Sequence, residues 1–310
     1  MSKYDAQIKD ACEKFAALLE GQLERVERIN AAGDFIDYKA LDKIIIGDMS
    51  DFDKEVAVYD WMTHELQFEQ GSLLVIPQTG EDSDNPYGVL KYHNAVCVGY
   101  ATTFRLFMQM MDIECKVVHD TSLVHSWDLV KLGDHWYHTD IYSDQSTGNY
   151  LNFNMSDSQC ASNHDWNRSF FPAADGYEYN YAYINRLEKE DIWDIAKVVR
   201  EALENGDNVI GIEFSDSIDE HKAQIAKSLM NEISNRVEGA EQFNSPSISW
   251  NWLNADGKYV FCCFIYTYEW SDDPIDPGLD DDDYMKIYQE IEDYFGDIEP
   301  NNWDYDEFNY

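Results

Sequence analysis

The sequence predicts an α+β protein in which a helix that begins at a cysteine packs on an antiparallel sheet, followed by a small second α+β domain. Three observations support this prediction. Apolar residues recur at three- and four-residue steps after Cys97, as they do along one face of a helix. Two strand-like runs, 125–132 and 135–141, are joined by a Gly-Asp dipeptide that is typical of a tight hairpin turn. After about residue 185 the helix and strand patterns alternate.

Composition indicates a globular protein and limits its partners. The 310 residues are 44% hydrophobic and 15% aromatic, which argues against disorder and favours two domains. The 61 acidic and 22 basic residues give a formal net charge of −39. Such a surface repels nucleic-acid phosphates and anionic lipids, so we expect neither a nucleic-acid nor a membrane partner. It attracts cationic molecules, at least as a bias on encounter rate.

The domain prediction has three parts. Residues 1–184 hold N-terminal helices, the cysteine helix and its hairpin, residues 185–270 form a β-α-β-β domain, and residues 271–310 form an acidic tail with a helix. No apolar run approaches the length of a transmembrane helix, and the N-terminus lacks the apolar core of a signal peptide. We therefore expect a cytoplasmic protein, or a secreted one if a signal peptide has been removed. The sequence leaves the oligomeric state open.

Helices and a loop are predicted before the cysteine. Apolar residues at helical intervals predict an amphipathic helix over 5–30. A second helix is predicted to begin near Ser50, with Asp53 three residues later as in a capping box. Residues 70–88 contain several Gly, Pro and Asp residues, so they predict a loop. This loop is either a lid over a substrate or an ordinary surface loop.

Cys97 lies in the first turn of its predicted helix. Unpaired backbone N–H groups and the positive end of the helix dipole stabilise an anion there, and the same effect favours a thiolate. The sequence therefore predicts a nucleophile at this position. Cys115 begins the strand-like run that leads toward His125, and we expect it to be a buried small hydrophobic residue instead of a second nucleophile.

The hairpin turn sets a register that brings two further residues together. The predicted opposite pairs are Leu132 with His135, Val130 with Tyr137, and Trp127 with Asp140. Because side chains alternate along strands, His125 and Asp140 become diagonal neighbours on one face. A carboxylate that orients an imidazole, and an imidazole that faces a thiol, form the arrangement used in covalent acyl transfer.

The second domain is predicted from local patterns. They indicate a helix over 190–204 that ends at Asn205-Gly206, a strand over 208–214, a helix capped by Ser217 that runs to about Arg236, and a hairpin of 247–254 and 259–270 around Asp256-Gly257. We find no catalytic constellation among these residues.

Several short runs resemble the bacterial transglutaminase-like superfamily in order and spacing. They are Tyr87-Gly88-Val89-Leu90, Val96-Cys97 with Gly99-Tyr100-Ala101, Ile113-Glu114-Cys115, His125 with Trp127, Trp136-Tyr137-His138 with Asp140, and Tyr150 with Asn152-Phe153. The resemblance covers roughly residues 50–175. It implies a papain- or transglutaminase-like core in which Cys97 is the nucleophile, His125 the base and Asp140 the orienting acid.

Two departures from the family pattern leave the three catalytic positions intact. Ser126 and Asp128 stand where the family usually has Ala and Asn, and Ile141-Tyr142 stands where Thr-Trp is frequent. We expect both departures to alter the substrate pocket.

These residues together predict acyl transfer through a thioester. The Cys97 thiolate attacks an amide carbonyl, the Cys97 N–H and one further donor stabilise the oxyanion, and His125 protonates the leaving amine. We expect the further donor among residues 92–94. The candidates for the substrate pocket are Tyr92, His93, Asn94, Trp127 and His138.

Three functions stay open at this point. We expect hydrolysis of a peptide or amide bond first, because hydrolysis needs only access for water. Transfer to an amine, as in a protein-glutamine transglutaminase, is second, since it needs a site that holds a lysine and excludes water. A non-catalytic binding or scaffold protein on the same fold is third. In each case the expected partner is a peptide or protein, and the acidic surface favours a cationic one.

No metal or cofactor is predicted. The six cysteines contain no Cys-x-x-Cys pair and fit a reducing compartment better than a disulfide scaffold. His135 and His138 are three residues apart on a strand and so face opposite sides, which is wrong for chelation. The run Asp280–Asp283 lacks the ligand spacing of a calcium loop. His164 belongs to the predicted loops of 143–182, either as a satisfied surface histidine or in a pocket wall.

Overall fold

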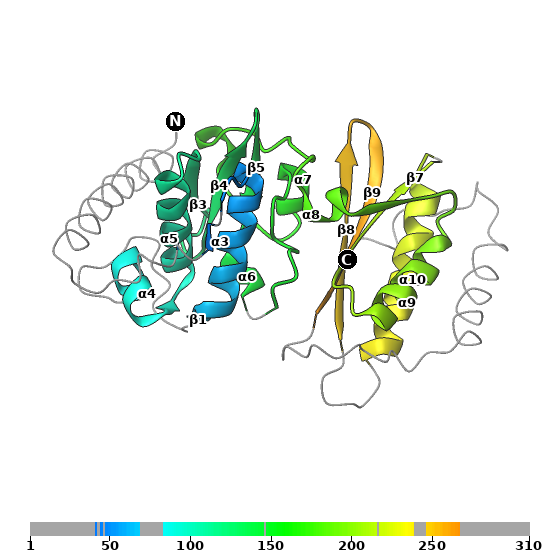
Figure 1. Ribbon diagram of the computed structural model, residues 1–310. Coiled ribbons are helices and arrows are strands. Elements are labelled where there is room, and N and C mark those ends of the chain that lie inside the picture. Colours follow the sequence, from blue (N-terminus) through cyan, green and yellow to red (C-terminus); the bar gives the residue numbers. More distant parts are fainter. Residues whose placement is uncertain are drawn as a thin grey trace. The chain divides into compact units, whose positions relative to one another are not determined.

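The chain forms two compact units, Met1–Ile184 and Asn185–Tyr310 (Figure 1). The computed structural model describes residues 47–68, 83–145, 147–215, 217–238 and 246–266, together with residues 41, 44 and 45. The predicted helix over 5–30, most of the predicted loop over 70–88 and the tail from residue 271 lie outside the described residues.

Among its described residues the first unit contains three longer helices, two of which begin at a side-chain cap. α3 (Asp51–Glu65) begins as predicted, because the Ser50 hydroxyl accepts from the Asp53 N–H and the Asp53 carboxylate accepts from the Ser50 N–H. α4 (Pro86–Tyr92) is capped by the Asn85 side chain. α5 (Cys97–Met110) begins at the predicted nucleophile.

The sheet of the first unit is antiparallel and has the predicted register. Its strands, in spatial order, are β3 (Cys115–His119), β4 (Ser126–Leu132) and β5 (His135–Thr139). Leu132 lies opposite His135 and Val130 opposite Tyr137, and the ladder ends one step before the third predicted pair. α5 packs against β3 and β4 (Figure 1). The predicted fold class, a cysteine-bearing helix on an antiparallel sheet, is therefore confirmed. β1 (Gln67–Phe68) and β2 (Asn94–Ala95) form a separate parallel pair.

The segment after β5 is more structured than the predicted loops. It contains the short helices α6 (Ile141–Asp144), α7 (Asp157–Cys160), η1 (Arg168–Phe170) and α8 (Tyr181–Ile184). Met155 pairs with His138 through two backbone hydrogen bonds of 2.8 Å, so the segment runs along the free edge of β5. Residues near 160 are thereby brought beside the hairpin.

The second unit is a four-stranded sheet with two helices on one face (Figure 1). Its elements are β6 (Arg186–Lys189), α9 (Asp194–Asn205), β7 (Val209–Phe214), α10 (Glu220–Glu238), β8 (Ser247–Ala255) and β9 (Lys258–Tyr266), and the strand order is β6-β7-β9-β8. Apolar residues of both helices and of β7, β8 and β9 form its core. The small α+β domain and its hairpin are as predicted.

Two details of the second unit differ from the prediction. β6 was not predicted, because its four residues are partly or fully exposed and show no apolar alternation; it pairs in parallel with β7. α10 begins at Glu220, and the Asp219 carboxylate, not Ser217, accepts from the backbone N–H of Lys222 at 2.8 Å.

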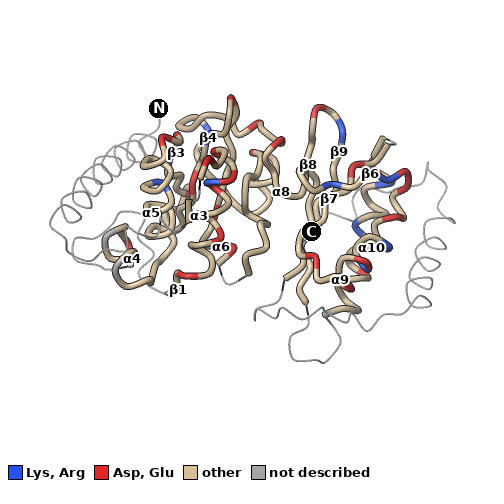
Figure 2. The backbone as a smooth tube through the Cα atoms, viewed as in Figure 1, with Lys and Arg blue, Asp and Glu red and all other residues tan. Residues whose placement is uncertain are grey.

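Acidic positions occur on elements of both units, with fewer basic ones between them (Figure 2). Among the described residues, no helix is both long enough and apolar enough to cross a membrane.

Candidate active site

Cys97 is buried at the first position of α5, with 3% of its surface exposed. Within the described residues no side chain caps this helix end at Val96, and the first turn holds no acidic residue. Gly99 allows residue 83 to lie across the turn, since a Cβ at Gly99 would be 2.1 Å from the Ser83 carbonyl oxygen. The Ser83 oxygen also accepts from the Val96 N–H at 3.0 Å. The positive end of the helix therefore acts on the thiol without a competing carboxylate.

His125 is held by its backbone and by its ring. Asp120 Oδ1 accepts from the backbone N–H groups of Val124, at 2.7 Å, and His125, at 3.0 Å. The imidazole stacks on Trp127 with ring centroids 5.8 Å apart. The Cys97 Sγ lies 3.9 Å from the Val124 carbonyl oxygen, so the same loop also contacts the thiol.

Asp140 lies at the end of β5 and caps α6. Its side chain is 1% exposed, and its Oδ2 is 2.7 Å from His125 Nε2. Ser143 donates to Asp140 twice, from its backbone N–H to Oδ1 at 3.1 Å and from its hydroxyl to Oδ2 at 2.5 Å. Because His125 Nε2 is hydrogen-bonded to Asp140, Nδ1 is the nitrogen left to interact with Cys97. The structure thus brings the three predicted residues together.

The charges of this set perturb its pKa values. Burial alone would lower the pKa of His125, but the charge and hydrogen bond of Asp140, followed by the interaction with Cys97, raise it to about 10. Burial likewise opposes ionisation of Asp140, yet His125 and then His164 hold the pKa of that carboxyl well below its usual range. An ionised Asp140 beside a protonated His125 is therefore favoured at neutral pH.

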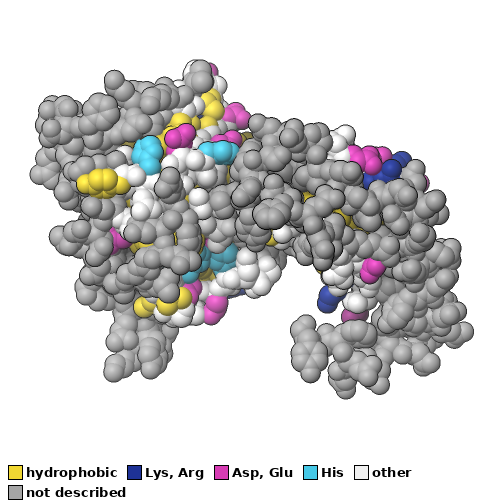
Figure 3. Space-filling model, turned by 90° about the horizontal axis from the view of Figure 1, so that it is seen from below, with side chains coloured by type: hydrophobic (Ala, Val, Ile, Leu, Met, Phe, Trp, Pro, Cys, Tyr) yellow, Lys and Arg dark blue, Asp and Glu magenta, His cyan; other side chains and the backbone are white. Residues whose placement is uncertain are grey.

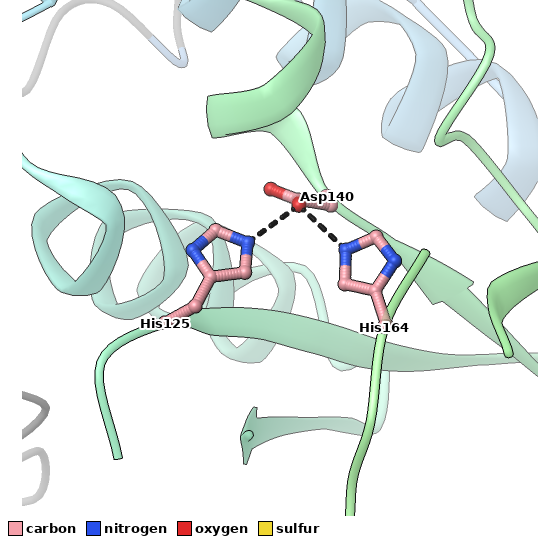
Figure 4. A group of neighbouring side chains, drawn as sticks. All are labelled: His125, Asp140 and His164. Atoms are coloured by element: carbon pink, nitrogen blue, oxygen red, sulfur yellow. Dashed lines mark hydrogen bonds and ion pairs between the residues drawn. The ribbon is translucent and has the colours of Figure 1, made fainter. Parts of the chain in front are cut away.

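A second histidine, His164, also contacts Asp140 (Figure 4). Its Nε2 lies 2.9 Å from Asp140 Oδ2, and its side chain is only 4% exposed. From the sequence, His164 is expected to be a satisfied surface histidine or part of a pocket wall, and no contact with Asp140 is predicted. The pairings of Met155 with His138 and of Trp166 with Asp120 hold its segment in place, and neither pairing has a local sequence signal.

Trp127 and His138, two predicted pocket residues, lie beneath the site and do not line it. Trp127 is 1% exposed and His138 is fully buried. The Trp127 indole donates to His138 Nδ1 at 3.0 Å, so the proton of His138 is on Nε2, which donates to Asp157 at 2.9 Å. Burial lowers the pKa of His138 against the opposing effect of Asp157. Together these residues support the His125 ring from within.

The other three predicted pocket residues form the approach to α5. Tyr92 ends α4 and is 51% exposed. His93 follows in the left-handed conformation, with φ of 54°, and its ring contacts Trp61. Asn94 pairs with Gln67 in the small parallel sheet.

Ser126 and Asp128, where the sequence departs from the family pattern, lie in the interior and not in a pocket. Ser126 Oγ is 3.0 Å from His119 Nδ1, and Asp128 Oδ1 is 3.5 Å from Cys115 Sγ. Both residues are buried, and burial raises the pKa of Asp128 well above its usual value. Both side chains contact the interior, and an effect of this departure on the substrate pocket stays a prediction. Cys115 is buried as predicted, and burial raises the pKa of its thiol.

His125, Asp140 and His164 each offer one ligand atom, and these three atoms lie within 4.8 Å of one another, a spacing that a metal ion could use. The Nε2 atoms of both histidines already have Asp140 as their hydrogen-bond partner. We therefore interpret the group as a proton-handling cluster.

Comparison with known proteins gives one match to a family model and a distant match to a solved structure. A solved structure described as the crystal structure of a TGase matches at 15% sequence identity with a TM-score of 0.27, over 46% of this chain and 33% of that one. The chain thus spans about a third of the TGase chain. No curated protein sequence matches. Residues 39–141 match the model of the transglutaminase-like superfamily, and this range includes Cys97, His125 and Asp140. The chain therefore contains a transglutaminase-like superfamily domain.

Proposed function

We propose that the protein is a cysteine-nucleophile acyl-transfer enzyme that hydrolyses a peptide or amide bond. The observation that carries this proposal is the series Cys97, His125 and Asp140 at the start of a helix, in which the thiol interacts with an imidazole that is hydrogen-bonded to a buried carboxylate. A thiol, a base and a buried carboxylate in this order are the parts that covalent acyl transfer requires.

The first half of the reaction forms a thioester. The Cys97 thiolate attacks the carbonyl carbon, a carbon–sulfur bond forms, and the carbonyl oxygen takes the negative charge near the N–H groups of α5. The tetrahedral species then collapses and the carbon–nitrogen bond breaks. His125, protonated on Nδ1 as well as Nε2, gives its Nδ1 proton to the leaving amine.

The second half of the reaction releases the acyl group. Neutral His125 removes a proton from water as the water oxygen attacks the thioester carbon. The carbon–sulfur bond breaks, the acid leaves, and Cys97 returns as a thiolate beside protonated His125. Asp140 keeps the imidazole oriented throughout, with Nε2 as its donor.

The surface supports a peptide or protein substrate, and its acidity favours a cationic one. The net charge of −39 biases encounters toward positive segments. On the face drawn in Figure 3, histidine side chains lie beside acidic and hydrophobic ones. Val124, next to His125, is 43% exposed and supplies an apolar contact at the site. The five cysteines of the described residues are free, which supports a reducing compartment such as the cytoplasm.

Transfer to an amine is the second candidate, and the acidic surface is the observation that favours it. A lysine side chain would replace water as the acyl acceptor. Incubating a glutamine-containing peptide with a fluorescent primary amine separates the two reactions: ammonia release without incorporation of the amine indicates hydrolysis, and incorporation indicates amine transfer.

The proposal is tested by the pH dependence of iodoacetamide alkylation at Cys97, read by peptide mass spectrometry. We expect rapid reaction at about pH 6 in the wild type, and loss of that reactivity in His125→Ala and Asp140→Asn. The buried thiols of Cys115 and Cys160 are internal controls, because burial raises their pKa values and they stay unmodified. Reaction of Cys97 only above about pH 8.5, unchanged in both variants, would favour the non-catalytic scaffold.

A further inference from the structure

Asp140 accepts hydrogen bonds from two imidazoles, and the proposed reaction uses only one of them. His125 Nε2 and His164 Nε2 lie 2.7 and 2.9 Å from the same oxygen, Oδ2. The Ser143 hydroxyl donates to that oxygen as well, at 2.5 Å. Figure 4 shows the two rings on opposite sides of the carboxylate. The role of His164 therefore depends on where its own protons are.

A chain of side-chain amides fixes the direction of the hydrogen bonds that reach His164. It begins at Asp144, whose oxygens accept from the Tyr59 hydroxyl at 2.7 Å and from Asn152 Nδ2 at 2.9 Å. With Asn152 Nδ2 turned to that carboxylate, Asn152 Oδ1 accepts from Asn163 Nδ2 at 3.2 Å. Asn163 Oδ1 is then the atom that faces His164 Nδ1, at 2.7 Å.

Both ring nitrogens of His164 therefore face acceptors. Nδ1 faces an amide oxygen and Nε2 faces a carboxylate oxygen, and neither oxygen can donate. Both hydrogen bonds form only when each nitrogen carries a proton, that is, when His164 is an imidazolium. Its side chain is 4% exposed and that of Asp140 is 1% exposed, which makes the two a buried ion pair.

We propose that His164 is a charged positioning residue that clamps Asp140 and sets the pH range in which Cys97 and His125 exchange a proton. This inference rests on the proposed function. Two imidazolium rings on one carboxylate repel each other, and the centroids of His125 and His164 are 5.6 Å apart. Trp127 contacts both rings, with centroids 5.8 and 4.6 Å away, and keeps this spacing. His164 thus weakens the hold of Asp140 on the His125 proton, which the leaving amine must receive.

The other titratable groups around the cluster do not mask the effect of the His164 charge on Cys97 and His125. The titratable groups that face the cluster are Cys97 of α5, Asp128 of β4, His138 of β5, Tyr142 and Asp144 of α6, and Cys160 of α7. Burial raises the pKa values of Asp128, Tyr142 and Cys160 and so disfavours the charged form of each. Burial also raises the pKa of Asp144 to about 7, but Asp144 is common to every protein compared below.

The test is the pH dependence of Cys97 alkylation in the full chain, in the wild type and in His164→Gln. Glutamine keeps an N–H donor for Asp140 and removes the charge. Loss of a nearby positive charge raises the pKa of every neighbouring group, so we expect the alkylation midpoint to move up by about half to one pH unit. The matched control is His138→Gln, another buried histidine that contacts Trp127 but hydrogen-bonds to Asp157. This control variant should change the rate of Cys97 alkylation without moving the pH midpoint of that reaction.

An unchanged midpoint in His164→Gln, with a lower rate at every pH, would overturn the inference and leave His164 with a structural role. This result differs from failure of the proposed function, in which wild-type Cys97 itself lacks rapid alkylation. A second measurement uses only the wild-type protein, so it does not depend on whether a variant folds. It is long-range nitrogen–proton NMR of the full chain, labelled with ¹⁵N-histidine, at neutral pH. We expect both nitrogens of His164 to be protonated, and a single protonated nitrogen would contradict the proposal.

Discussion

The two units bury different kinds of side chain. The core of the second unit is built from apolar residues of α9, α10 and the sheet. The first unit also buries apolar residues, but among the described residues every buried polar or charged side chain except Glu213 belongs to it. Glu213 itself is paired with Arg186, at 2.7 Å, and with Lys258.

This difference shows where the molecule tolerates an unfavourable interior. A buried polar group destabilises a fold unless hydrogen bonds replace its lost water. In the first unit nearly all such groups are satisfied, and within the described residues only Thr103 Oγ1 and Arg105 NH1 lack a partner. The network holds protons and charges in fixed positions around Cys97. The described residues of the second unit form an apolar core.

The largest expected effect on stability is in the apolar core. Phe261 is fully buried, and its ring packs on Trp250 and Trp252 with centroids 5.8 and 5.3 Å apart. Phe261→Ala should lower the free energy of unfolding of the second unit by about 3–5 kcal/mol. Hydrogen exchange at increasing urea, read by mass spectrometry for peptides of each unit, measures this. Native Cys97 alkylation should not change, and a parallel loss of reactivity would break the comparison.

The unfolding free energy of the first unit, which buries polar groups, should depend on pH, whereas the apolar core of the second unit gives no such dependence. Glu55 is buried and accepts from Thr139 Oγ1 at 3.3 Å and from Asn154 Nδ2 at 2.9 Å. Burial raises its pKa from 4.5 to about 8. Between these values the unfolded chain is ionised and the folded chain is protonated. The stabilising contribution of the protonated form is therefore complete below pH 4.5 and is lost as the pH rises to about 8.

Glu55→Gln removes this titration and keeps an acceptor. Relative to the variant, the wild type should lose roughly 1 kcal/mol of unfolding free energy for each pH unit between 4.5 and about 8. The matched control is Glu213→Gln, because Lys258 and Arg186 lower the pKa of Glu213 and its contribution has the opposite sign, present above the unfolded pKa. Urea titrations across the pH range test both, and equal slopes for wild type and Glu55→Gln would show that Glu55 is not protonated in the fold.

The comparison also explains what the sequence could predict. α3, α5, α9 and both hairpins have caps, turns or periodic apolar residues, so local interactions specify them. β6 lacks such a pattern and exists through its pairing with β7. His164 reaches Asp140 because its segment pairs with His138 of β5 through Met155 and with Asp120 through Trp166. Cys97, His125 and Asp140 could be predicted because a helix start and a hairpin register place them. The groups that support them depend on contacts between distant residues.

The smallest expected effect is on Cys97 reactivity, and it should distinguish the β4–β5 hairpin from the β8–β9 hairpin. Gly133 and Gly257 both have positive φ, 59° and 85°, and an added Cβ would meet no atom within 4 Å at either position. Gly133→Ala and Gly257→Ala should each therefore cost about 1 kcal/mol through backbone strain alone. Their effects on Cys97 should differ. The first turn fixes the register between the strands that lead to His125 and Asp140, so strain there disturbs their 2.7 Å contact.

The second turn joins β8 and β9, which contribute to the apolar core of the other unit. Gly133→Ala should therefore lower the rate of Cys97 alkylation about twofold to threefold, a loss of well under 1 kcal/mol in the stability of the thiolate pair. Gly257→Ala should leave that rate unchanged at the same cost in unfolding free energy. Equal losses of reactivity in the two variants would mean that any loss of stability reaches the site, and that register at the first hairpin has no special role.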